Sequence, residues 1–74
     1  MEEYKYLGAL GKGLCDALYY AKKGETILVS ELQPGDYKQL KEEVEKFFPG
    51  RVSVRKTLLT FLGFGNECVL TKVA

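Results

Sequence analysis

The sequence contains no histidine, and among its 74 residues there are only two cysteines and two prolines. Histidine is the usual general base of enzymes and the commonest metal ligand, so its absence argues against hydrolytic and metal chemistry. Cys15 and Cys68 lie fifty-three positions apart, far from any metal-ligand spacing. The hydroxyls of Ser30 and Ser53 have no evident base. We therefore expect a protein that is not an enzyme and that holds no metal or cofactor.

The chain also lacks a strong charge of either sign, since its formal net charge is +1. No bulk attraction to nucleic acid or to an anionic membrane follows from such a balance. Apolar residues make up 46% and charged residues 28%, which is ordinary for a folded domain. A chain of this length buries only about 60% of its unfolded surface. We expect a single small domain over residues 1–74 with a thin core.

Long apolar runs are missing, because no stretch of 18 uncharged residues occurs. The start is acidic, and Lys5 and Lys12 interrupt the first apolar stretch, which is unlike a signal peptide. A cytoplasmic location without membrane contact is the expectation, with Cys15 and Cys68 as reduced and mostly buried thiols. A bridge between them would need Cα atoms within about 7 Å, and the sequence leaves this open.

The clearest element is a helix over residues 36–48. Pro34 and Gly35 turn the chain into it, and Asp36 with Gln39 three positions later forms a capping-box pattern. Pro49 and Gly50 end it. The apolar side chains at helical spacing predict one buried stripe: Tyr37, Leu40, Val44, Phe47 and Phe48.

Three further segments have the pattern of strands. Residues 26–32 form a β-rich run bounded by Gly24 and Pro34. Residues 51–55 alternate apolar and polar positions, and the strand pattern continues to Leu62. Residues 63–66 are a turn signal, and residues 67–73 return as the second arm of a hairpin.

The first 23 residues allow two interpretations. The spacing of Leu7, Leu10 and Leu14, continued by Ala17, Leu18 and Ala21, favours one long helix. Glycines inside it would each cost about 1 kcal/mol. The other interpretation is a strand over residues 4–7, a loop over 8–13 and a helix over 14–23. The fold is then α+β with two helices on a small mixed three-stranded sheet, in the order α-β-α-β-β, or alternatively β-α-β-α-β-β.

Residues 58–64 are the most informative stretch, because five of these seven positions are large and apolar. A strand beside water should alternate, whereas here both faces would be apolar and both must be covered. Two helices cover one face of so small a sheet, so the other face needs a partner. We expect a protein-interaction surface, with a second protomer as the simplest partner and a larger protein as another. The residues of this interface are Leu58, Leu59, Phe61, Leu62 and Phe64.

An alternative function is DNA or RNA binding through the same hairpin. Residues 51–74 carry a net charge of +3, from four cations and Glu67. Arginine and lysine contact phosphates, while nearby aromatic rings stack on bases. The cations of this alternative are Arg51, Arg55, Lys56 and Lys72.

Overall fold

The computed structural model describes residues 2–74 and has seven secondary-structure elements in this range. In chain order they are β1 (Glu2–Lys5), α1 (Lys12–Tyr20), β2 (Thr26–Ser30), α2 (Asp36–Phe47), β3 (Val52–Lys56), α3 (Leu58–Phe61) and β4 (Cys68–Lys72). The fold is α+β, as the sequence predicts.

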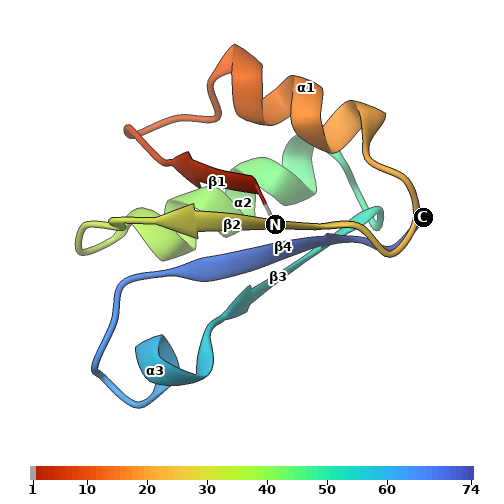
Figure 1. Ribbon diagram of the computed structural model, residues 1–74. Helices are drawn as coiled ribbons and strands as arrows, with labels where there is room; N and C mark the ends of the chain where they lie inside the picture. Colours follow the sequence, from red (N-terminus) through yellow and green to blue (C-terminus); the bar gives the residue numbers. More distant parts are fainter. Residues whose placement is uncertain (1) are drawn as a thin grey trace.

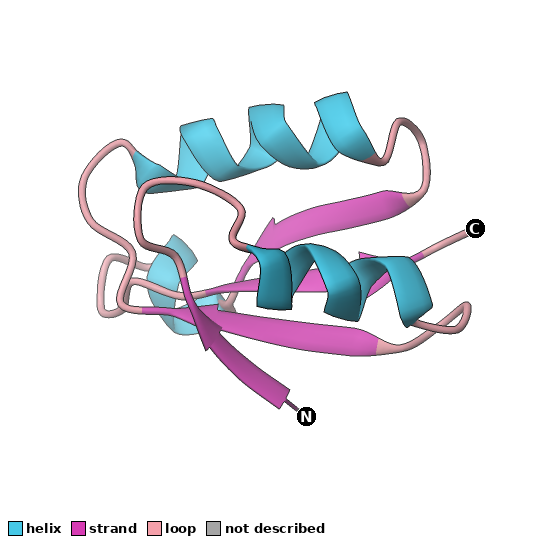
Figure 2. Cartoon of the chain, turned by 90° about the horizontal axis from the view of Figure 1, so that it is seen from above, coloured by secondary structure: helices cyan, strands magenta, loops and turns pink. Residues whose placement is uncertain are grey.

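The strands form one mixed sheet in the order β1-β2-β4-β3. β1 is parallel to β2, while β4 is antiparallel to both of its neighbours, β2 and β3. The β1-α1-β2 and β2-α2-β3 connections therefore join parallel strands and move in the same direction across the sheet. Two crossovers of the same hand that move the same way place their helices on the same face. Figures 1 and 2 show α1 and α2 side by side over one face of the sheet.

The beginning of the chain corrects the first interpretation of the sequence. Residues 1–23 do not form one long helix; the described part consists of β1, a loop and the nine-residue α1. The sheet consequently has four strands among the described residues rather than three. Tyr6 explains the outcome, because its ring is buried and its hydroxyl donates a hydrogen bond to Glu43 of α2. This contact with α2 holds the start of the chain in an extended conformation.

The helix over residues 36–48 is confirmed as α2, but its beginning differs from the capping-box prediction. Gly35 is the residue before the helix, and its φ of 89° favours glycine. The Asp36 carboxylate accepts a hydrogen bond of 2.8 Å from the Gln33 N–H in the preceding turn. The Gln39 amide donates instead to the carbonyl of Gly8. These two side chains thus hold the loops before α2 and α1.

The hydrophobic core lies between the sheet and these two helices. Phe47 departs from the predicted stripe, with 55% of its surface exposed. The helix ends there, and Phe48, with a φ of −133°, is buried in its place. The six largest fully buried side chains come from both helices and the two central strands: Leu18, Leu40, Val44, Val29, Cys68 and Leu70.

The hairpin of β3 and β4 is confirmed as an antiparallel pair, whereas its connection is not strand-like. The predicted continuation of the strand to Leu62 is wrong, since β3 ends at Lys56 and α3 follows. In Figure 1, α3 lies beyond the end of β3, on the side of the sheet away from α1 and α2. The apolar residues of this segment are therefore carried by a helical turn that the two long helices do not cover.

Candidate functional site

The segment after β3 forms a helix because both of its ends are capped by local hydrogen bonds. The Thr57 hydroxyl accepts from the N–H of Thr60 at 3.3 Å, as an N-cap residue does. At the other end, the N–H of Gly63 donates to the Thr60 carbonyl and the N–H of Phe64 to the Leu59 carbonyl. This pair of bonds, with Gly63 at a φ of 89°, is a Schellman motif. The Thr57 and Gly63 positions are the sequence signal for this helix.

Thr60 also ties α3 to the start of β4. Its Oγ1 accepts a hydrogen bond of 2.8 Å from the Glu67 N–H and another of 2.8 Å from the Thr57 hydroxyl. The Thr57 N–H in turn donates to the Glu67 carbonyl at 3.3 Å. Gly65 packs against the same hydroxyl, since a Cβ at this position would lie 3.0 Å from Thr60 Oγ1. The helical turn is thus held in place by polar contacts rather than by its apolar side chains.

Those apolar side chains point into solvent. Between 55% and 80% of the surface of each is exposed, although these are large Leu and Phe residues. A cluster of this kind on a small domain marks an interaction surface more often than a neutral surface. We call this cluster the α3 surface, and its members are the five residues of the predicted interface: Leu58, Leu59, Phe61, Leu62 and Phe64.

The basic residues of the alternative function are not brought together in the same way. Arg51, Arg55 and Lys56 are exposed, but Arg51 precedes β3 while the other two lie at its far end. The Lys56 ammonium lies over the ring of Tyr37, 4.9 Å from its centroid. The exposed cations therefore follow the outer strand of the sheet without converging.

Lys72 lies in the interior, with 8% of its surface exposed. Its ammonium donates hydrogen bonds to the carbonyls of Leu18, Tyr19 and Ala21, at 2.7, 3.3 and 3.1 Å. These are the carbonyls at the end of α1, which have no partner within the helix. In this arrangement Lys72 caps α1 and does not face a phosphate in solvent.

Both cysteines are free thiols, and they differ in burial. Cys15 is half-buried on α1, whereas Cys68 has none of its surface exposed. Burial raises the pKa of the Cys68 thiol to about 11. A thiol of this kind is protonated at neutral pH and does not act as a nucleophile.

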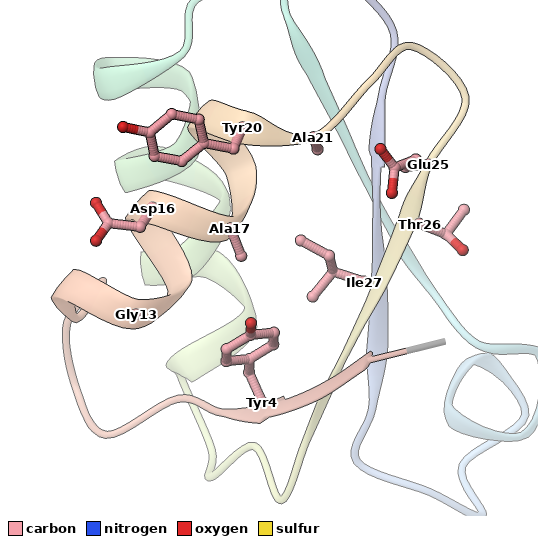
Figure 3. Close-up of a pocket in the computed structure, with 9 residues that line it drawn as sticks. All are labelled: Tyr4, Gly13, Asp16, Ala17, Tyr20, Ala21, Glu25, Thr26 and Ile27. Atoms are coloured by element: carbon pink, nitrogen blue, oxygen red, sulfur yellow. The ribbon is translucent and has the colours of Figure 1, made fainter.

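A hollow lies between α1 and the β1 and β2 strands (Figure 3). Tyr4, Ala17 and Ile27 point into it, whereas the Asp16 carboxylate and the Tyr20 ring lie along the outer side of α1. Asp16 is paired with Lys12 at 3.0 Å. This hollow has a mixed polar and apolar lining, and the carboxylates of Asp16 and Glu25 do not converge on a point where a substrate would react.

Comparison with known proteins gives no relative for this chain: no family model, curated protein or solved structure matches it significantly. Within residues 2–74, no three or more His, Cys, Asp or Glu side chains are grouped so as to hold a metal ion. None of the helices in this range has both the length and the hydropathy to cross a membrane. The α3 surface is thus the feature on which a function can be argued.

Proposed function

We propose that this protein is a small non-enzymatic binding module that acts through protein–protein contacts at the α3 surface. The observation that carries the proposal is the exposure of five large apolar side chains on the capped helical turn α3 and the three residues that follow it. Its partner is a second copy of the chain or a larger protein that the module occupies or inhibits. The absence of histidine and the burial of the Cys68 thiol support a role without catalysis.

The energy available at the α3 surface is comparable to the cost of association. Burying one exposed Leu or Phe side chain contributes about 1.5–3 kcal/mol, so five contribute on the order of 10 kcal/mol. Association costs about 4–15 kcal/mol in lost translational and rotational freedom. The two terms are of the same size, and polar contacts around the apolar centre would add to the balance. The fixed geometry of α3 also lowers the ordering cost, because Thr57 and Thr60 already hold it in place.

A charge placed in the α3 surface tests this function. Leu59→Asp should remove the bound partner, because an ionised carboxylate would be buried in an apolar contact. Leu7→Asp is the matched control, since Leu7 is 87% exposed and lies outside the α3 surface. The measurement is affinity capture with tagged chains from cells of the source organism, with the retained proteins, untagged copies included, quantified by mass spectrometry. Retention of every partner by a folded Leu59→Asp variant would refute the proposal.

DNA or RNA binding remains the second candidate, supported by the exposure of Arg51, Arg55 and Lys56. With Lys72 engaged at the end of α1, the hairpin offers three cations for phosphate contacts. Affinity for duplex DNA would then fall with salt along a log–log slope of about −2 to −3. Fluorescence anisotropy at several salt concentrations measures this slope, and a signal that is independent of salt would exclude this mode of binding.

A further inference from the structure

The outer edge of β3 is an open edge of the sheet. β3 is last in the order β1-β2-β4-β3. On its inner side, the Val73 N–H donates to the Arg51 carbonyl and the Thr57 N–H to the Glu67 carbonyl. Because hydrogen-bonded positions alternate along an antiparallel ladder, the odd-numbered residues of β3 bond to β4. The N–H and C=O groups of Val52, Val54 and Lys56 consequently point outward, away from β4.

Two grooves follow this edge and meet at Val54. The first runs between α2 and β3 and has Val44 and Val52 among its apolar residues. Its charged residues are two lysines and two glutamates: Lys38, Lys41, Glu42 and Glu45. The second continues along the end of β3, where Leu58 and Phe61 of the α3 surface line it together with Lys56. The edge thus has a groove with no net formal charge near α2 and a basic end near α3.

We propose that the outer edge of β3 pairs with β3 of a second copy of this chain, antiparallel and about a two-fold axis through Val54. The two four-stranded sheets would then form one continuous sheet of eight strands. The pairing places Val54 opposite the partner's Val54 and Val52 opposite the partner's Lys56, with hydrogen bonds at these positions. All five residues of β3 are used, and every outward N–H and C=O group finds an acceptor or a donor.

The charges favour this register. The partner's Lys56 is brought beside Val52, at a groove whose two glutamates and two lysines leave it without net charge. Arg55 faces the partner's Ser53 rather than another cation. A register centred on Arg55 would instead place two arginines opposite each other, and like charges in directly opposed positions are destabilising. The position of Arg55 therefore favours the alignment centred on Val54 over the one centred on Arg55.

The inference rests on the proposed function in one respect, because Leu58 and Phe61 of the α3 surface flank the pairing. Leu59, Leu62 and Phe64 are not among the residues that line this edge, so they remain available for a larger protein. A dimer of this form would present two copies of that remaining surface, related by the two-fold axis. A partner with two matching sites would then be held by both.

Cross-linking tests the register directly. In a Cys15→Ser background, where the remaining native thiol is the buried Cys68, a tagged Ser53→Cys chain is mixed with an untagged Arg55→Cys chain and oxidised. Opposed residues at a position without hydrogen bonds have Cα atoms about 4.5 Å apart, which is within disulfide range. We expect a mixed disulfide dimer and little cross-linking of either variant alone. Absence of the mixed dimer, or a predominance of self-linked Ser53→Cys or Arg55→Cys, would overturn the proposed alignment.

Light scattering at up to about 1 mM protein tests the assembly itself. The unmodified chain should have twice the monomer mass. Val54→Pro should have the monomer mass, because proline removes an outward N–H and leaves the bonds to β4 in place. Val54→Thr keeps the N–H and should remain a dimer. A monomeric unmodified chain would overturn the pairing, and the cross-linking result decides the case if Val54→Pro does not fold.

The outcomes separate this inference from the proposed function. Leu59→Asp should keep the mixed disulfide while losing its larger partner. If the unmodified chain is a monomer and Leu59→Asp still loses a larger partner, the β3 pairing is wrong and the function stands. If the mixed disulfide forms and Leu59→Asp keeps all partners, the pairing stands and the function is wrong.

Discussion

The ammonium of Lys72, at the end of β4, donates a hydrogen bond of 2.7 Å to the main-chain carbonyl of Leu18 in α1. The same group contacts the carbonyls of Tyr19 and Ala21. Carbonyls at the end of a helix carry partial negative charge and need partners. Here the partner of these carbonyls is the Lys72 ammonium, which comes from the sheet. Lys72 therefore joins the helical layer to the sheet.

Replacement of this lysine should lower stability more than replacement of a lysine in solvent. Lys72→Met keeps most of the aliphatic stem and leaves the α1 carbonyls without their donor. We expect a loss of about 2 kcal/mol in the free energy of unfolding, as for other hydrogen bonds to charged groups. Urea denaturation followed by circular dichroism measures it. Lys23→Met, at an exposed position just after α1, is the control and should change stability by less than about 0.5 kcal/mol.

Tyr6 and Glu43 form the second link between distant segments. The buried Tyr6 hydroxyl donates to one carboxylate oxygen of Glu43, and the other oxygen accepts from the Leu10 N–H at 3.4 Å. Tyr6→Phe removes the donor but keeps the ring, so we expect a loss of about 1.5–3 kcal/mol. Hydrogen exchange should also be faster at Leu10, because the loop before α1 is less restrained. An unchanged exchange rate at Leu10 would contradict this role of Glu43.

The helix α2 could be predicted from the sequence because its signals are local. Gly35 and Pro49 mark its limits, and the spacing of Leu40 and Val44 fixes its buried face. The start of the chain could not be decided in this way, since Leu14 and Leu18 fit both interpretations. What decides it is the burial of Tyr6 against α2, a contact across 37 positions. Short-range spacing carries no information on such a contact.

The candidate site was predictable in composition but not in conformation. The apolar content of residues 58–64 indicated an interaction surface whether the segment was a strand or a helix. Its helical form depends on Thr57 as N-cap and Gly63 at the C-terminus of the helix. The prediction of a strand followed the composition of the segment and did not treat these two residues as helix ends. For Lys72, a charged residue in a hairpin predicted exposure, whereas the carbonyls at the end of α1 provide it with a buried site.

Thr60 offers a test of how α3 is held. Thr60→Val is similar in shape and removes the hydroxyl that accepts hydrogen bonds from Glu67 and Thr57. We expect faster hydrogen exchange at the Glu67 amide and a loss of about 1–2 kcal/mol in stability. Partner binding at the α3 surface should weaken although its five apolar side chains are unchanged. Thr60→Ser, which keeps the hydroxyl, should restore the exchange rate; failure to do so would assign the effect to the lost methyl group.

The buried thiol of Cys68 should make stability depend on alkaline pH. Burial raises the pKa of this thiol from its ordinary 9.0 to about 11 in the folded protein. The unfolded chain thus loses the proton first, and the stabilisation present below pH 9 is lost as pH rises from 9 towards 11. The expected slope approaches 1.4 kcal/mol per pH unit in that window. Tyr6 contributes in the same direction at higher pH, because burial and the Glu43 hydrogen bond also raise its pKa above 10.

Urea denaturation at pH values from about 8 to about 9.5 isolates the cysteine effect, since this window lies below the ordinary tyrosine pKa of about 10. Cys68→Ala should have a flatter dependence on pH, whatever the cost of the smaller side chain. Cys15→Ser keeps the buried thiol and should retain the decline of the unmodified protein. Equal slopes for Cys68→Ala and Cys15→Ser would show that the Cys68 thiol ionises as readily in the folded chain as in the unfolded one.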